Sequence, residues 1–161
     1  PEAEVLVSGG EPYGRDVDWR LRVAQVFLMS SGEEQGSLPK VSTFRDLLAW
    51  QAAKQLALEV LRSCERPEMR RYYGLCDQLR RAAISVPSNI AEGNERGTNL
   101  DALRFLQVAR GSLAELETQL ELSRDFGSLP AADYDRVSPQ VVRVGRLLGG
   151  LIKARQTRQT N

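Results

Sequence analysis

From residue 42 onward, apolar residues recur every three or four positions, which is the period of an amphipathic α-helix. Three of these stripes are regular. They comprise Met69, Tyr72, Cys76, Leu79, Ala83, Val86 and Ile90; then Leu106, Ala109, Leu113, Leu116 and Leu120; then Tyr134, Val137, Val141, Val144, Leu148 and Leu151. Alternating spacings of three and four are typical of helices that cross at a shallow angle, so the pattern predicts an all-α, antiparallel, up-down-up-down four-helix bundle.

A less regular stripe precedes these three and predicts the first helix, which runs to about Cys64 and ends before Pro67. Thr43, with Asp46 three residues later, has the order of an N-cap and its returning carboxylate. Four residues fit an apolar seam, and other apolar side chains lie elsewhere around the helix. The seam comprises Phe44, Leu47, Leu58 and Leu61, and the others are Leu48, Trp50, Leu56 and the alanines at 49, 52, 53 and 57. A helix that is apolar on more than one side suits packing on its own bundle and on another subunit.

Glycine and proline mark the expected connections. GNERG at 93–97 separates the second helix from the third, with Gly93 expected in the left-handed conformation just after the helix. GSLP at 127–130 separates the third from the fourth, and Pro130 suits a first helical turn. We expect a flexible leader over 1–42, the bundle over 43–155 and a flexible basic tail over 156–161. Met29 is a candidate natural start, which would place residues 1–28 outside the natural product.

The second helix carries a proline in its body, within the segment SVPSNIAEG at 85–93. Pro87 lacks the N–H that would bond to the carbonyl of Ala83, and such a residue costs roughly 3 kcal/mol in a helix interior. Nearby serines and Asn89 are the residue types that satisfy such backbone groups locally. Gln78, Arg81, Ser85, Ser88 and Glu92 fall on the side away from the apolar seam. That side is either a solvated face or a built polar surface.

Composition and charge narrow the classes of function. The chain has no histidine and two cysteines, Cys64 and Cys76, which excludes histidine-based acid–base catalysis, a histidine-containing triad and a Cys/His zinc site. We therefore predict no metal, no cofactor and no enzyme. No apolar run approaches the ~20 residues that span a bilayer, so we expect no membrane partner and a cytoplasmic setting. Residues 43–161 carry 18 basic and 14 acidic side chains, a mildly basic balance.

Three blocks carry a resemblance to a known family. FRDLLAWQAAKQLA at 44–57, QLRRAAISVPSNIAEG at 78–93 and GSLAELETQLELS at 111–123 resemble the four-helix bundle proteins encoded in intervening sequences of bacterial 23S ribosomal RNA genes. The likeness covers residues 43–153. It implies a bundle that assembles with itself, typically as a ring of five. A more remote likeness is to the accessory variability protein of diversity-generating retroelements, a pentameric bundle that binds a reverse transcriptase and RNA.

The resemblance implies an oligomer interface or structural motif at the family's characteristic positions and transfers no catalytic role. These positions match Trp50, Gln78, Leu79, Arg81, Ser85, Pro87, Asn89, Glu92, Gly93, Gly111, Ser112 and Glu115. Glycine within a helix costs up to about 1 kcal/mol relative to alanine, so the Gly111–Ser112 pair suits close approach of the second helix near its proline or of a neighbouring subunit. Glu115 would then meet Arg81 or Asn89.

Three classes of function remain. Glu92 and Glu115 are a candidate carboxylate pair, but bundles with two metals use Glu-x-x-His, so catalysis is disfavoured. RNA or DNA binding would use basic side chains, although arginines also pair with nearby carboxylates, as at Asp77 and Arg81. No single-strand platform of interleaved aromatic residues is visible. The third class is an assembly scaffold or accessory subunit for a protein such as a reverse transcriptase. The predicted nucleic-acid contacts are Arg70, Arg71, Arg143, Arg146, Lys153, Arg155 and Arg158.

Overall fold

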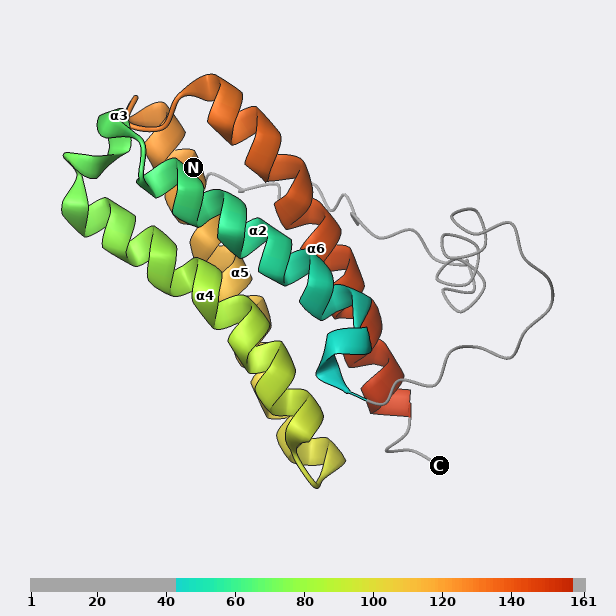
Figure 1. The fold of residues 1–161 in the computed structure, drawn as a ribbon. Coiled ribbons are helices and arrows are strands. Elements are labelled where there is room, and N and C mark those ends of the chain that lie inside the picture. Colours follow the sequence, from blue (N-terminus) through green and yellow to red (C-terminus); the bar gives the residue numbers. More distant parts are fainter. Residues whose placement is uncertain (1–42, 158–161) are drawn as a thin grey trace, which may run out of the picture. The chain divides into compact units, whose positions relative to one another are not determined.

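The computed structural model describes residues 43–157, and the long helices in this range form a four-helix bundle. The elements are η1 (Phe44–Asp46), α2 (Leu48–Cys64), α3 (Pro67–Arg70), α4 (Tyr73–Glu95), α5 (Asn99–Asp125) and α6 (Ala131–Thr157). Helices α2 and α5 each pack between α4 and α6, with neighbours antiparallel (Figure 1). This confirms the predicted bundle. None of the described helices has the length and apolarity to cross a membrane. The predicted leader, Met29 and Arg158 lie outside the described residues.

The core is built from aliphatic side chains, as the three regular stripes predict. Every residue of these stripes is buried except Tyr72, Tyr134 and Leu151, which are half-buried. Leu56, Leu79, Leu106, Leu116 and Leu148 are among the largest fully enclosed side chains. Burial of such side chains contributes about 1.5–3 kcal/mol each, which makes this packing the main source of stability.

The predicted seam of the first helix is wrong. The structure turns Ala49, Ala53, Leu56 and Val60 into the core, whereas the expected set, Phe44, Leu47, Leu58 and Leu61, is only half-buried. The cause lies at Leu47, which has an extended backbone between η1 and α2. A hydrophobic period counted from Phe44 crosses this break, so beyond Leu47 it selects the wrong face of α2. The predicted cap does form on η1, since Arg45 N–H donates to Thr43 Oγ1 (3.2 Å) and Thr43 N–H donates to Asp46 (2.9 Å).

The connections differ from prediction at two places. The second helix is split, because α3 ends before Tyr72 and α4 starts after it. Gly93 is not a left-handed terminal residue, because α4 continues to Glu95. A Cβ atom on Gly93 would lie 3.0 Å from the carbonyl oxygen of Ala102 and 3.2 Å from Cβ of Phe105, so glycine here permits the close approach of α5. Among the described glycines, only Gly127, between α5 and α6, has a positive φ (78°).

A buried carboxylate ties three segments together at one end of the bundle. Asp133, in the first turn of α6, is 1% exposed. It accepts a hydrogen bond from Arg66 (2.8 Å), just before α3, and forms an ion pair with Arg136 (N···O 2.9 Å). Arg136 also pairs with Glu59 of α2 (3.0 Å). A buried charge with two guanidinium partners is compensated, so this network fixes where α6 starts relative to α2 and α3.

Candidate functional site

The polar side chains around Pro87 bond to backbone carbonyls and a hydroxyl group of their own helix. Helix α4 continues through Pro87 as one element. Ser88 Oγ donates to the carbonyl of Ile84 (2.8 Å), and Asn89 Nδ2 donates to the carbonyl and hydroxyl oxygens of Ser85 (2.8 and 3.0 Å). These bonds go to the carbonyls of Ile84 and Ser85, so they do not replace the donor that the Ala83 carbonyl loses to Pro87, and the expected satisfaction of that carbonyl is not what these side chains provide.

One hydrogen bond joins this turn to α5. The hydroxyl groups of Ser85 and Ser112 lie 2.8 Å apart, and both residues are half-buried. Ser85 therefore belongs to the contact between α4 and α5, which corrects the expectation that it falls on the side away from the apolar seam. The other residues expected on that side are exposed, namely Gln78, Arg81, Ser88 and Glu92.

Gly111 and Ser112 have different surroundings in the structure. Ser112 meets α4 near Pro87, as predicted. Gly111 is exposed, and a Cβ atom added there would have no neighbour within 4 Å, so within one chain no helix approaches it. The expected contacts of Glu115 with α4 are replaced by a bond on its own helix, because Glu115 accepts from Gln119 Nε2 (2.9 Å). Arg81 pairs instead with Asp77 (2.9 Å), as its spacing predicts.

Most of the characteristic positions share one side of the bundle. Because Ser85 meets Ser112, residues one and two turns away on each helix extend the same surface. Exposed apolar side chains flank it, since Val108 and Leu122 on α5 are 52% and 59% exposed. We call this surface the α4–α5 face; it comprises Gln78, Arg81, Ser85, Ser88, Asn89 and Glu92 of α4 and Val108, Gly111, Ser112, Glu115 and Leu122 of α5.

Two carboxylates of this surface have separate partners. Glu92 forms an ion pair with Arg96, whose guanidinium lies 4.5 Å from the centre of the Phe105 ring. Glu115 is held by Gln119. Each carboxylate therefore interacts with a neighbour along the chain.

Trp50 lies away from the α4–α5 face. Its ring meets Phe44 edge-on, with centroids 5.1 Å apart, and the Lys54 ammonium lies 5.4 Å from its ring centroid. Trp50, Lys54, Gln140 and Arg143 line a groove of about 360 Å³ between α2 and α6. The structure thus brings Trp50 together with one of the predicted nucleic-acid contacts, Arg143.

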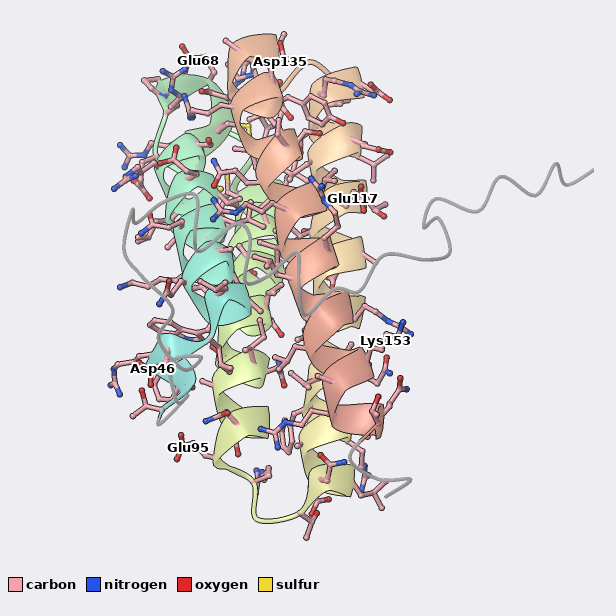
Figure 2. The ribbon with its side chains drawn as sticks, turned by 90° about the vertical axis from the view of Figure 1, so that its right-hand side faces the viewer. Asp46, Glu68, Glu95, Glu117, Asp135 and Lys153 are labelled. Carbon is pink, nitrogen blue, oxygen red and sulfur yellow. The ribbon has the colours of Figure 1, made fainter. Side chains whose placement is uncertain are left out.

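The predicted basic contacts do not form a single patch. Arg70 and Arg71 lie at the end of α3, Arg143 and Arg146 lie in the middle of α6, and Lys153 lies near its far end. In Figure 2, Glu68 and Asp135 mark one end of the bundle, whereas Lys153 lies toward the other. A helix of 27 residues is about 40 Å long, so Arg70 and Arg71 are separated from Lys153 by much of the length of α6.

Arg155 has a structural environment. It is half-buried, its guanidinium donates to Asn94 Oδ1 (3.3 Å), and its backbone carbonyl accepts from Asn99 Nδ2 (2.7 Å). These bonds join the end of α6 to the connection between α4 and α5. Arg155 therefore takes part in closing the bundle at this end.

Comparison with known proteins identifies the family. The sequence profile of the 23S rRNA-intervening sequence protein family matches residues 45–150, about two-thirds of the chain. The chain belongs to this family. The 23S rRNA-intervening sequence proteins have no established function, and membership confirms the resemblance seen in the three sequence blocks. A search of curated proteins finds no match.

A solved structure supports the fold of this 23S rRNA-intervening sequence protein. It is the crystal structure of a protein of unknown function of the S23 ribosomal protein family, from Bacteroides thetaiotaomicron. The two chains are 18% identical and superpose with a TM-score of 0.61, over 66% of this chain and 99% of the other. At this identity the likeness establishes the shared bundle only.

Proposed function

We propose that the protein is a non-enzymatic homo-oligomer whose copies meet through the α4–α5 face, and that the assembly binds RNA or another nucleic acid through its arginines. A closed ring of five copies is the arrangement that the family resemblance implies. The two halves of the proposal have separate support and separate tests.

Gly111 is the observation that carries self-association. A glycine in the middle of a helix is less favourable than alanine by up to about 1 kcal/mol, and no neighbouring atom within the chain needs the space it leaves. Exposed Val108 and Leu122 lie on either side of it along α5. A surface with a bare stretch of backbone between apolar side chains suits the close approach of a second helix.

A matched pair of glycines tests this half. Gly149 in α6 is also exposed, and it too has no atom within 4 Å of an added Cβ. We expect Gly111→Gln to lower the mass measured by light scattering and Gly149→Gln to leave the oligomer intact. A monomeric wild-type protein, or an oligomer equally insensitive to both changes, would refute the proposed interface.

Unpaired arginines support nucleic-acid binding. Within residues 43–157, no ion pair to a carboxylate involves Arg70, Arg71, Arg143, Arg146 or Lys153, whereas seven other arginines have such partners. A cation without a counter-charge is free to contact a phosphate, and repetition around an oligomer multiplies the field.

Salt dependence tests this half. We expect binding of a fluorescent RNA to weaken steeply with salt and to be abolished when Arg70, Arg71, Arg143 and Arg146 become glutamine. A glutamine replacement of Arg45, Arg104 and Arg110, which likewise form no ion pair with a carboxylate of residues 43–157, serves as the comparison at other sites. An oligomer that binds no RNA at any salt concentration would instead favour the scaffold for a partner protein.

A further inference from the structure

No aromatic side chain of residues 43–157 is fully buried. The described range contains seven aromatic rings, and the buried core contains none of them. Four of the seven gather at the end of the bundle where α3 lies beside the turn between α5 and α6 (Figure 1). We call this set the aromatic end; it comprises Tyr72, Tyr73, Phe126 and Tyr134.

Ring–ring and ring–guanidinium contacts occur together at the aromatic end. The Tyr72 and Phe126 rings meet edge to face, with centroids 5.5 Å apart. The guanidinium of Arg71 lies 4.9 Å from the centre of the Tyr72 ring, and that of Arg124 lies 4.4 Å from the centre of the Tyr134 ring. The α3–α4 junction, the end of α5 and the first turn of α6 each contribute, so the arrangement exists only in the folded chain.

Two of these rings are open to solvent. Tyr73 is 73% exposed and Phe126 is 69% exposed, which makes them the most exposed large apolar side chains of the described range. Aromatic side chains contribute strongly to stability when they are buried, and these two contribute little in this way. Exposed rings of this kind are typical of surfaces that bind a partner.

The charge at the aromatic end indicates the kind of partner. Arg70 and Arg71 have no ion pair with a described carboxylate, and the Arg71 guanidinium instead lies over a ring. Arg124 has an exposed pair with Asp125, which is weak in water. Protein interfaces are also rich in aromatic residues and arginine, so the feature that favours a polyanion as the partner is the lack of a carboxylate partner for Arg70 and Arg71 within residues 43–157. A single-stranded nucleic acid uses both the rings and the arginines, because bases stack on rings and phosphates pair with arginines.

We propose that the aromatic end binds single-stranded nucleic acid, with bases stacked on Tyr73 and Phe126 and phosphates held by Arg70 and Arg71. The site rests on the proposed RNA binding and gives it a location and a preferred form of ligand. A duplex is a poorer ligand because its base faces are already stacked on one another. The aromatic end cannot be recognised from the sequence because segments about 50 residues apart contribute its rings.

Ring substitutions separate stacking from charge. The test is fluorescence anisotropy with the full-length protein and its variants. The probe is a fluorescent oligouridylate of about 12 nucleotides, and its binding is followed over a range of salt concentrations. Tyr73→Ala and Phe126→Ala should each raise Kd roughly 5- to 150-fold, the range for loss of one stacked base, with the salt dependence unchanged. Tyr73→Phe and Phe126→Tyr should retain binding, since a ring without or with a hydroxyl stacks equally.

The arginine variant should behave differently. Arg70→Gln with Arg71→Gln should lower the slope of log K against log salt by about 0.7 for each single-strand phosphate that the protein no longer neutralises. Leu100→Ala, which shortens another exposed apolar side chain at the start of α5, should leave Kd unchanged. Duplex RNA of the same length should bind more weakly than the single strand.

The outcomes distinguish this site from the broader proposal. Wild-type protein that binds no RNA removes both. RNA binding that tolerates both alanine variants removes the aromatic end alone and leaves the α6 arginines as the contact. Alanine variants that bind RNA normally but show a lower mass in light scattering would assign the rings to a contact between copies, which overturns the inference.

Discussion

Replacing Gly93 by alanine tests why α4 carries a glycine where its helix continues. Alanine is better than glycine in a helix interior by up to about 1 kcal/mol. The new Cβ would lie 3.0 Å from a backbone oxygen of α5 and 3.2 Å from Cβ of Phe105, positions that no side-chain rotation relieves. Overpacking of this kind costs about 1–3 kcal/mol, so the net effect is a destabilisation of roughly 0–2 kcal/mol.

The same change at Gly149, in α6 and outside the proposed interface, is the matched control. Gly149→Ala meets no atom within 4 Å, so it should gain the full helix preference and stabilise the fold by up to about 1 kcal/mol. The helix preference is common to both variants and cancels in their difference. The difference in unfolding free energy between the two variants should therefore equal the cost of overpacking alone, about 1–3 kcal/mol.

Urea unfolding followed by far-UV circular dichroism measures this difference. With a denaturant slope of about 1–3 kcal/mol per molar, a gap of 2 kcal/mol separates the two midpoints by roughly 1 M. Protein concentration must be the same for both variants, because self-association adds to apparent stability. Equal midpoints for Gly93→Ala and Gly149→Ala would refute the close approach of α5 as the reason for Gly93.

Three further predictions concern the interior. Asp133→Ala should destabilise the fold by about 2–3 kcal/mol, because it removes a charge-assisted hydrogen bond from Arg66 and an ion pair with Arg136. Arg66→Ala should cost about 1 kcal/mol or less, because half of the Arg66 side chain is exposed, and thermal unfolding that ranks the two variants the other way would contradict the network. A double-mutant cycle of Ser85→Ala and Ser112→Ala should give a coupling of about 0.5–1.5 kcal/mol in chemical denaturation, and a coupling of zero would argue against their hydrogen bond. Burial, with the neighbouring Cys76, raises the pKa of the Cys64 thiol from 9.0 to about 12, so the thiol keeps its proton to higher pH in the folded state than in the unfolded state. The contribution of the Cys64 thiol to the free energy of unfolding should be fully present below pH 9 and should fall between pH 9 and 12 by up to about 1.4 kcal/mol per pH unit. A Cys64→Ala variant whose stability declines as steeply over this range would contradict the assignment.

The sequence predicts the bundle well where helices are continuous. The stripes through Leu79, Leu113 and Val144 keep their period over several turns, so the aliphatic core follows from the spacing. The first helix fails because one extended residue, Leu47, shifts the phase between η1 and α2, and a hydrophobic period has no means of detecting such a break. The role of Gly93 was mistaken for a similar reason, since a glycine near a helix end looks the same in sequence whether it terminates that helix or admits another.

The candidate surfaces were less predictable because they depend on which helices are neighbours. The polar residues around Pro87 are visible as a group, but the Ser85–Ser112 contact requires knowledge of the register between α4 and α5. The aromatic end escaped prediction altogether, because Tyr72 and Phe126 lie at helix boundaries where no period links them. Asp133 was likewise missed, since nothing in its local sequence distinguishes a buried carboxylate from a solvated one.

The absence of aromatic rings from the described core has a spectroscopic consequence. Tyr73 is open to solvent and Trp50, Tyr72 and Tyr134 are half-buried, so these rings have less of the asymmetric packing that produces strong near-ultraviolet dichroism than rings enclosed in a core. A weak near-ultraviolet spectrum is commonly taken as the mark of a molten globule. The rings of residues 43–157 are therefore expected to give a weak near-ultraviolet spectrum even in the fully native state, and the emission of Trp50 should report events at the surface before the melting of the interior.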